Sequence, residues 1–215
     1  MGGKFSLVGL TGEIGSGKTT MARELCAHYD NAREFTFAAP IKKFVKCLFP
    51  NLDLTDKIKC ENVRVDFPSS RLNDRGKTTI KSALTYRKLF QFLGTELIRD
   101  MVSRDYFLHA ISAEIKEFLY NYDGDSLLIV SDVRFNNEAR WIIDNGGKII
   151  KIVDCADGCS ARLRDSAFHK SESGIDAEFI SFVCENDKRL NPHLLYKWFV
   201  ENVKENLEEY GVIRS

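Results

Sequence analysis

The sequence predicts an α/β domain in which helices cover both faces of a parallel β-sheet. Two observations lead to this fold class. Short runs rich in apolar and β-branched residues alternate along the chain with longer segments of helical periodicity. Strands separated in this way pair in parallel through right-handed crossovers, and the connecting helices then lie against the sheet.

Five runs have the composition of strands. The run at 126–131 is nearly all apolar, as expected for a central strand that is buried on both faces. The expected strands are residues 4–10, 34–37, 126–131, 148–153 and 179–184.

Six further segments have the apolar spacing of helices. Asn145-Gly-Gly147 predicts the end of one of them, because glycine commonly follows the last turn of a helix. The expected helices are residues 19–29, 41–49, 86–100, 104–120, 136–145 and 191–209.

Residues 50–84 do not follow this alternation. They are polar and contain turn signals such as Asn73-Asp-Arg-Gly76, so we expect an irregular stretch. A loop of this length is either functional, here as an access path for an anionic substrate, or a solvated surface excursion. Its basic residues are Lys57, Lys59, Arg64, Arg71, Arg75, Lys77 and Lys81.

The composition is that of a globular protein, with 44% hydrophobic and 29% charged residues. Its 31 basic and 31 acidic residues cancel, so the charge balance favours neither nucleic acid nor an anionic membrane as partner. The six cysteines lack C-x-x-C spacing, and His169 is too isolated to complete a zinc site with them. Without an evident signal peptide or membrane span, we expect a cytoplasmic protein with reduced thiols.

A phosphate-binding motif lies between the first expected strand and the helix that follows. Residues 12–19 read Gly-Glu-Ile-Gly-Ser-Gly-Lys-Thr, a complete G-x-x-x-x-G-K-[ST] pattern. Its glycines let backbone N–H groups approach a polyphosphate, and the positive end of the helix dipole adds to the attraction. Lys18 is expected to reach the β- and γ-phosphates and Thr19 to ligate Mg²⁺. The predicted ATP contacts in this segment are Gly12, Gly15, Ser16, Gly17, Lys18, Thr19 and Thr20.

A second candidate site lies on the helix expected at 86–100. Arg87 and Gln91 are four residues apart and therefore share one face. A guanidinium can hold a phosphate with two hydrogen bonds, and an amide can pair with a base edge. The two side chains could grip both ends of a nucleoside monophosphate; the alternative is a polar helix surface.

Asp132 and Arg134 follow the apolar strand expected at 126–131. They would lie at the carboxyl edge of the sheet, where open α/β folds bind their ligands. Asp132 could bind Mg²⁺ or a substrate hydroxyl, and Arg134 could contact the transferring phosphoryl group. Alternatively, Asp132 caps the next helix and Arg134 pairs with Glu138.

Arg162 and Arg164 lie in a polar segment between the fourth and fifth expected strands. Two close arginines there could fold over the β- and γ-phosphates and neutralise charge in the transition state. His169, nearby, is better explained as a structural or loop-anchoring residue than as a base, because phosphoryl transfer depends mainly on positioning and electrostatics.

Three segments together resemble the phage and viral deoxynucleoside monophosphate kinases, a branch of the P-loop nucleoside monophosphate kinases. They are Arg87-Lys-Leu-Phe-Gln-Phe-Leu-Gly-Thr-Glu96, Val130-Ser-Asp-Val-Arg-Phe-Asn-Asn-Glu-Ala139 and His169-Lys-Ser-Glu172. The resemblance implies a P-loop kinase fold with a five-stranded parallel core. It also implies an acceptor-binding helical insertion, placed here at 41–110, and a lid, placed at 155–175.

The same resemblance implies transfer of the ATP γ-phosphate to a deoxynucleoside monophosphate, for nucleotide precursor supply. The Arg-x-x-x-Gln spacing also resembles that of adenylate kinases, which implies that Arg87 binds the acceptor phosphate and Gln91 the base. Glu185-Asn-Asp187 resembles the loop near the ATP adenine in this kinase class, which implies that Asn186 lies there. Lys18, Arg134, Arg162 and Arg164 are the expected catalytic residues, and Thr19 with Asp132 the Mg²⁺ ligands. Asp132 and Arg134 are also expected to contact the substrate. Glu13 either approaches the acceptor or is simply exposed to solvent. We further expect small-molecule partners, a possible homodimer, and the host cytoplasm as location if the protein is viral.

Two other functions are also compatible with the sequence. The segment Val8-Gly-Leu-Thr-Gly-Glu-Ile-Gly-Ser-Gly-Lys-Thr-Thr20 resembles the opening of dephospho-coenzyme A kinases. Those kinases usually carry a D-x-D acid pair after the second strand, where this chain has Phe37-Ala-Ala-Pro40. A P-loop switch that binds a nucleoside triphosphate without a small acceptor is the further alternative.

Overall fold

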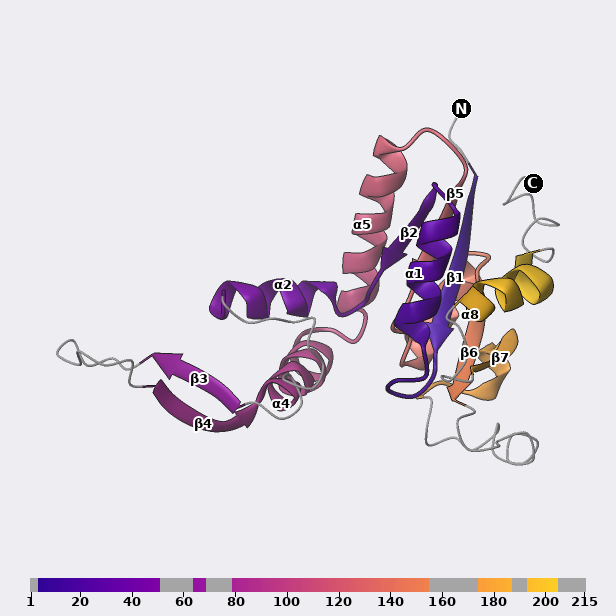
Figure 1. The fold of residues 1–215 in the computed structure, drawn as a ribbon. Helices are drawn as coiled ribbons and strands as arrows, with labels where there is room; N and C mark the ends of the chain where they lie inside the picture. Colours follow the sequence, from indigo (N-terminus) through magenta and orange to yellow (C-terminus); the bar gives the residue numbers. More distant parts are fainter. Residues whose placement is uncertain (1–3, 51–63, 69–78, 155–173, 187–192, 205–215) are drawn as a thin grey trace. The chain divides into compact units, whose positions relative to one another are not determined.

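The computed structural model describes residues 4–50, 64–68, 79–154, 174–186 and 193–204 (Figure 1). The chain divides into two compact units. The larger unit consists of residues 1–37 and 108–215, and the smaller unit consists of residues 38–107.

The larger unit is built on a five-stranded sheet in which every neighbouring pair is parallel. The strand order is β2-β5-β1-β6-β7, so β1 is central and the chain crosses over between β1 and β2. This confirms the predicted α/β fold with a parallel sheet. The strands are β1 (Phe5–Thr11), β2 (Ala32–Phe35), β5 (Ser126–Val130), β6 (Lys148–Asp154) and β7 (Phe182–Asn186).

Helices cover both faces of this sheet. They are α1 (Lys18–His28), α5 (Tyr106–Asn121), which begins in the smaller unit, α6 (Asn136–Asp144) and α8 (His193–Phe199). Two short elements complete the described part of this unit, the 3₁₀ turn η2 (Ala177–Phe179) and the π-helix η3 (Val200–Lys204), which continues α8.

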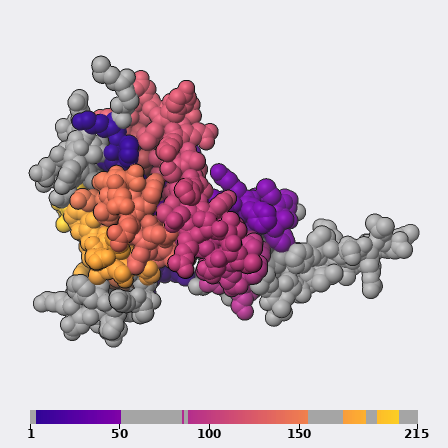
Figure 2. Space-filling view, turned by 180° about the vertical axis from the view of Figure 1, so that it is seen from behind, coloured from indigo at the N-terminus to yellow at the C-terminus, as the bar shows by residue number. Residues whose placement is uncertain are grey.

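Alternation along the strands sorts the core into two layers, because successive side chains of a strand point to opposite faces. On one face, Val8 and Leu10 of β1 belong to a buried cluster with residues of α1, α8 and η3. On the other face, Gly9 lies under α6, where a Cβ would come within 2.7 Å of Ile142 Cδ1. Phe35 contacts Phe118 of α5 edge to face. Figure 2 shows the side of the molecule on which α5 and α6 form the outer layer.

The smaller unit combines helices with a two-stranded antiparallel ribbon. Within it, Ile41 of the first helix lies against Gly94 of the π-helix, where a Cβ would be 2.8 Å from Ile41 Cδ1. The Arg99 guanidinium lies over the Phe107 ring, 4.8 Å from its centroid. The elements are α2 (Ala39–Leu48), β3 (Arg64–Pro68), β4 (Thr79–Thr85), α4 (Tyr86–Gln91) and the π-helix η1 (Phe92–Val102).

The ribbon of β3 and β4 corrects the prediction that residues 50–84 are irregular throughout. The apolar residues of these strands, Val65 and Phe67 in β3 and Ile80, Ala83 and Leu84 in β4, are no denser than in the chain as a whole, and turn signals fill the segment between the strands. The two strands satisfy each other through backbone hydrogen bonds, which do not depend on an apolar pattern.

Three predicted boundaries also differ from the structure. The helix expected at 86–100 is α-helical only to Gln91 and continues as a π-helix to Val102. The fifth strand begins at Phe182, because Ala177–Phe179 form a 3₁₀ turn that the apolar pattern did not distinguish from strand. The last helix is described from His193 to Lys204. No helix in the described ranges has the length and apolarity needed to span a membrane.

The buried strand β5 offers a test of the core. Ile129 is fully buried between β1 and β2, so Ile129→Ala should reduce the free energy of unfolding by about 2–5 kcal/mol. Ile143 on α6 is 39% exposed, and Ile143→Ala should change the free energy of unfolding by less than about 1 kcal/mol. Denaturant unfolding measures both, and equal losses would contradict the described core.

Candidate active site

The phosphate loop joins β1 to α1 at the carboxyl edge of the sheet. Gly12, Gly15 and Gly17 have φ values of 138°, 81° and 109°, a region that favours glycine. Gly17 is the residue that precedes α1, and no side chain caps this helix end. The N–H groups of the first turn of α1 are therefore oriented toward the loop, as anion binding at a helix N-terminus requires.

The ends of the neighbouring strands leave no room for side chains at two of these glycines. A Cβ on Gly12 would lie 2.2 Å from the carbonyl oxygen of Ile152 on β6. A Cβ on Gly17 would lie 2.3 Å from Nδ2 of Asn186, the last residue of β7. Glycine is thus required both by the backbone angles and by the packing of the loop against the sheet.

Asn186 supports the loop directly. Its Nδ2 donates a hydrogen bond to the carbonyl oxygen of Ser16 at 2.8 Å. The Ser16 hydroxyl is buried and has no hydrogen-bond partner within the described residues. A buried hydroxyl of this kind is a donor that an oxygen-rich ligand could satisfy.

The Lys18 side chain bridges the loop in this structure. Its Nζ donates to the carbonyl oxygens of Gly12 at 2.7 Å and Glu13 at 2.6 Å. The ammonium is therefore held over the loop backbone, close to the N–H groups of α1. Glu13 is exposed, and Thr19 and Thr20 are half-buried in the first turn of the helix.

The segment after β5 is joined to the ends of β1 and β2. Val133 donates its N–H to Leu10 at 3.1 Å and accepts from the Thr11 hydroxyl at 3.0 Å. Asp132 Oδ1 accepts the N–H of Phe37 at 2.8 Å. The structure therefore brings Asp132 to the same edge of the sheet as the phosphate loop, with its carboxylate fixed at one oxygen.

Glu138 organises the start of α6. This carboxylate is 1% exposed, and its Oε2 accepts the N–H groups of Arg134 at 2.7 Å and Phe135 at 3.1 Å. A glutamate in the first turn that reaches back to the preceding N–H groups is a common way to satisfy a helix N-terminus. The expected alternative contact between Arg134 and Glu138 thus involves the backbone of Arg134, whose side chain is exposed.

The described residues 174–176 contact the segment at the start of α6, residues 134–136. Asn136 Nδ2 donates to Asp176 Oδ2 at 2.9 Å, and the Asp176 N–H donates to Asn136 Oδ1 at 2.8 Å. Gly174, with φ +71°, lies so close to Arg134 that a Cβ would be 2.1 Å from its carbonyl oxygen. The chain thus leaves the predicted lid at a fixed point beside Arg134.

The remaining predicted site residues lie either in the smaller unit or outside the described residues. Gln91 is exposed at the end of α4 in the smaller unit, and Arg87 lies on the same helix, with its side chain outside the described part. Arg162, Arg164 and His169 lie outside the described residues. The support by Asn186 and the anchoring of Asp132 at Phe37 were not predicted, because both depend on strand order.

Helix α1 contains one cysteine, Cys26, whose thiol is partly buried. Burial raises its pKa because it disfavours the thiolate, and the Glu34 carboxylate raises the pKa further. The Ser131 hydroxyl donates a hydrogen bond to Glu34. A thiol with a raised pKa is a poor nucleophile at neutral pH, so Cys26 is a packing residue.

The fold and the site define a class of protein. A parallel sheet whose β1 leads through a glycine-rich loop into α1, with an acid after the neighbouring β5, is a P-loop nucleotide-binding protein. Residues 48–197, more than half of the chain, match the family model "Deoxynucleotide monophosphate kinase". A protein of Acanthamoeba polyphaga mimivirus, "Putative deoxynucleotide monophosphate kinase", is 33% identical over 153 residues, covering 68% of this chain and 72% of that protein.

This chain belongs to the deoxynucleotide monophosphate kinase family. It is a kinase that uses ATP and a small-molecule nucleotide acceptor, and dephospho-coenzyme A kinase is not favoured. The matched residues begin at 48, after the phosphate loop. The family match and the loop geometry are therefore separate observations that agree.

Two glycines with positive φ allow a matched test of the loop. Gly17→Ala adds a Cβ 2.3 Å from Asn186, whereas Gly146→Ala, at φ 77°, meets nothing within 4 Å. Because strain of about 1–3 kcal/mol must be relieved by moving the loop, Gly17→Ala should weaken ATP binding about tenfold to a hundredfold. Gly146→Ala should leave ATP affinity unchanged in calorimetric titration. Equal affinities in both variants would refute the role given to loop packing.

Proposed function

We propose that this chain transfers the γ-phosphoryl group of ATP to a deoxynucleoside monophosphate in the presence of Mg²⁺, with the phosphate loop as donor site. The observation that carries the proposal is that the segment after β5 is held beside the loop, because Asp132 accepts the Phe37 N–H after β2 and Val133 is hydrogen-bonded to Leu10 and Thr11 of β1. Hydrogen bonds that fix this acid at the carboxyl edge of the sheet suit a site that must position phosphates and a cation.

ATP would bind with its β- and γ-phosphates on the loop. The N–H groups of the loop and of the first turn of α1 donate to the phosphate oxygens, and Ser16 offers its buried hydroxyl. Lys18 would turn from the carbonyl oxygens of Gly12 and Glu13 toward the phosphates, which attract the ammonium more strongly than neutral carbonyls do. Asn186 would act on ATP by holding the loop in this conformation.

Mg²⁺ would be held by the Thr19 hydroxyl and the Asp132 carboxylate. Both supply oxygen atoms, which this hard cation prefers, and water and phosphate oxygens complete such sites. Asp132 Oδ1 accepts the Phe37 N–H, so the carboxylate cannot turn freely. When bound, the ion would neutralise charge on the β- and γ-phosphates.

The insertion, proposed at 41–110, would bind the acceptor. Arg87 would hold its phosphate, Gln91 its base, and Glu13, Asp132 and Arg134 the part nearest the donor. Arg87 and Gln91 share one face of α4 because they are four residues apart. The acceptor phosphate is anionic near neutral pH, so attack on the γ-phosphate needs positioning and no strong general base.

Arg134, Arg162 and Arg164 would neutralise the charge that develops during transfer. The proposed lid, residues 155–175, would bring the last two arginines over the phosphates and exclude water. Its support comes from the contacts of Asn136 with Asp176 and of Gly174 with Arg134. These contacts couple the end of the lid to the segment that presents Arg134.

The proposed partners are small molecules, without nucleic acid or membrane, because the charges of the chain cancel. The proposed location is the cytoplasm, where ATP and deoxynucleotides are available. We also propose a homodimer, and gel filtration of the full chain tests it.

The activity is tested by measuring diphosphate formation from a panel of nucleoside monophosphates with ATP and Mg²⁺. Lys18→Ala should lower kcat/KM by about a hundredfold or more, because it removes a charge aimed at the transferring group. Lys197→Ala, on the exposed surface of α8, is the control and should leave the rate unchanged. A normal rate for Lys18→Ala would rule out the proposed donor site, and turnover of dephospho-coenzyme A alone would select the other kinase class.

The role of Gln91 predicts a change in base preference. Gln91→Ala should lower kcat/KM for the preferred base by roughly twofold to tenfold, the worth of a lost hydrogen bond, with little change in the KM for ATP. Asp100→Ala, at an exposed position of η1, should preserve the preference. If Gln91→Ala reduced the rate equally for all acceptors, the proposed contact with the base would be wrong.

A further inference from the structure

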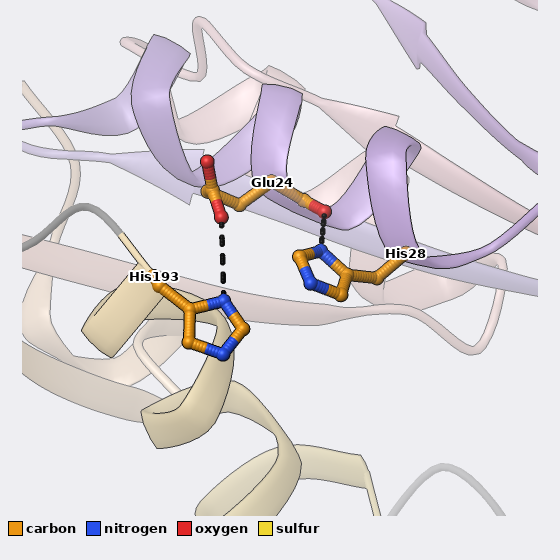
Figure 3. Close-up of side chains that lie close together, drawn as sticks. All are labelled: Glu24, His28 and His193. Atoms are coloured by element: carbon orange, nitrogen blue, oxygen red, sulfur yellow. Dashed lines mark hydrogen bonds and ion pairs between the residues drawn. The ribbon is translucent and has the colours of Figure 1, made fainter.

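A cluster of metal-ligating side chains lies on the larger unit, apart from the phosphate loop. Glu24 and His28 are one helical turn apart on α1, and His193 is the first residue of α8 (Figure 3). One ligand atom from each of the three residues lies within 4.8 Å of the other two. The three residues come from elements that are distant in sequence but packed together.

The His28 ring is oriented as in a metal ligand. Its Nδ1 lies 2.8 Å from the carbonyl oxygen of Glu24, which can only accept, so Nδ1 carries the proton and Nε2 the lone pair. The ring also stacks on Tyr196 of α8, with centroids 3.8 Å apart and planes 15° from parallel. Histidines that bind metals usually donate their other ring N–H to a carbonyl or carboxylate, which fixes the tautomer and the ring.

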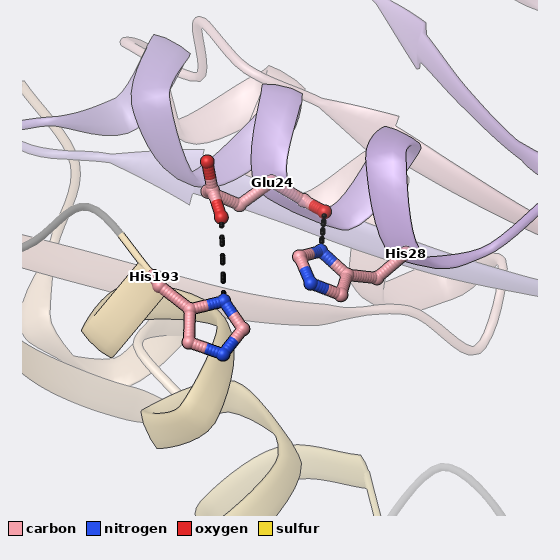
Figure 4. A network of polar contacts seen from close by, with 3 residues as sticks. All are labelled: Glu24, His28 and His193. Carbon is pink, nitrogen blue, oxygen red and sulfur yellow. Dashed lines mark hydrogen bonds and ion pairs between the residues drawn. The ribbon is translucent and has the colours of Figure 1, made fainter.

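Glu24 and His193 supply the complementary charge and the second imidazole. Their closest atoms, Glu24 Oε2 and His193 Nδ1, are 3.8 Å apart (Figure 4). The side chain of His193 is 55% exposed and that of Glu24 is 25% exposed, so an ion can reach both from solvent. Zinc ligands in a tetrahedron are about 3.4 Å apart, a contraction that rotation of these side chains can supply.

We propose that Glu24, His28 and His193 form a binding site for a divalent ion of the zinc class. Two imidazole nitrogens and one carboxylate oxygen suit zinc and disfavour Mg²⁺, which prefers oxygen ligands. A water molecule would complete the coordination. The site lies six to ten residues after Lys18, about 9–15 Å along α1, so it is distinct from the phosphate loop. We assign it a structural role. It cross-links α1 to α8 and stabilises their packing.

Zinc titration of the full chain, monitored by calorimetry after removal of metals, tests the site. The wild type should bind one high-affinity ion per chain. His28→Asn and His193→Asn should each weaken binding about tenfold or more. His109→Asn, which alters an exposed histidine of α5 outside the cluster, should bind zinc like the wild type. Unchanged affinity in His28→Asn and His193→Asn, or no binding to the wild type, would overturn the proposal.

Cobalt spectroscopy and thermal unfolding separate this site from other sources of zinc binding. Co²⁺ bound by imidazole and carboxylate gives no thiolate charge-transfer band, so an intense band would assign the ion to cysteines instead. Zinc should raise the unfolding midpoint of the wild type and not that of the double variant His28→Asn/His193→Asn, since a ligand stabilises the state that binds it. Equal shifts in both proteins would also reject the site. These measurements do not depend on kinase activity.

Discussion

The structure depends on the contact between the phosphate loop and the ends of the neighbouring strands. A Cβ on Gly12 would overlap the carbonyl oxygen of Ile152, a Cβ on Gly17 would overlap the Asn186 amide, and that amide donates a hydrogen bond to the carbonyl oxygen of Ser16. The loop is thus held from β6 and β7, while its ends are fixed by β1 and α1. A backbone constrained from several directions can present its N–H groups to phosphates without reorganising, which is what electrostatic catalysis requires.

The opposite side of the site is held by short-range hydrogen bonds between strand ends. Thr11 and Leu10 of β1 bind Val133, and Phe37 after β2 binds Asp132. Buried Glu138 then satisfies the N–H groups of Arg134 and Phe135. Asp132 and Arg134 therefore lie in one segment between the end of β5 and the start of α6, and these hydrogen bonds hold that segment in place. The pair formed by Asn136 and Asp176 extends this bracing to the end of the proposed lid.

Much of this was predictable from local patterns. The apolar runs identified five strands to within a few residues, and the motif from Gly12 to Thr19 identified the loop whose glycines have positive φ. The hairpin of β3 and β4 was missed because its two short strands have no more apolar residues than the rest of the chain, and their pairing rests on backbone hydrogen bonds that composition does not show. The cluster of Glu24, His28 and His193 was also missed. Sequence shows the i, i+4 spacing on α1 but gives no indication that α8 brings a second histidine to it.

The sequence by itself determined the class of the fold, the phosphate loop and the kinase family, because periodicity, glycine positions and family segments are properties of contiguous residues. Only the tertiary structure decided the strand order β2-β5-β1-β6-β7, and with it which side chains meet. Asn186 is 170 residues from Ser16 and Asp132 is 95 from Phe37, yet each pair is in hydrogen-bond contact. The physical reason is that parallel strands align their carboxyl ends whatever their separation along the chain.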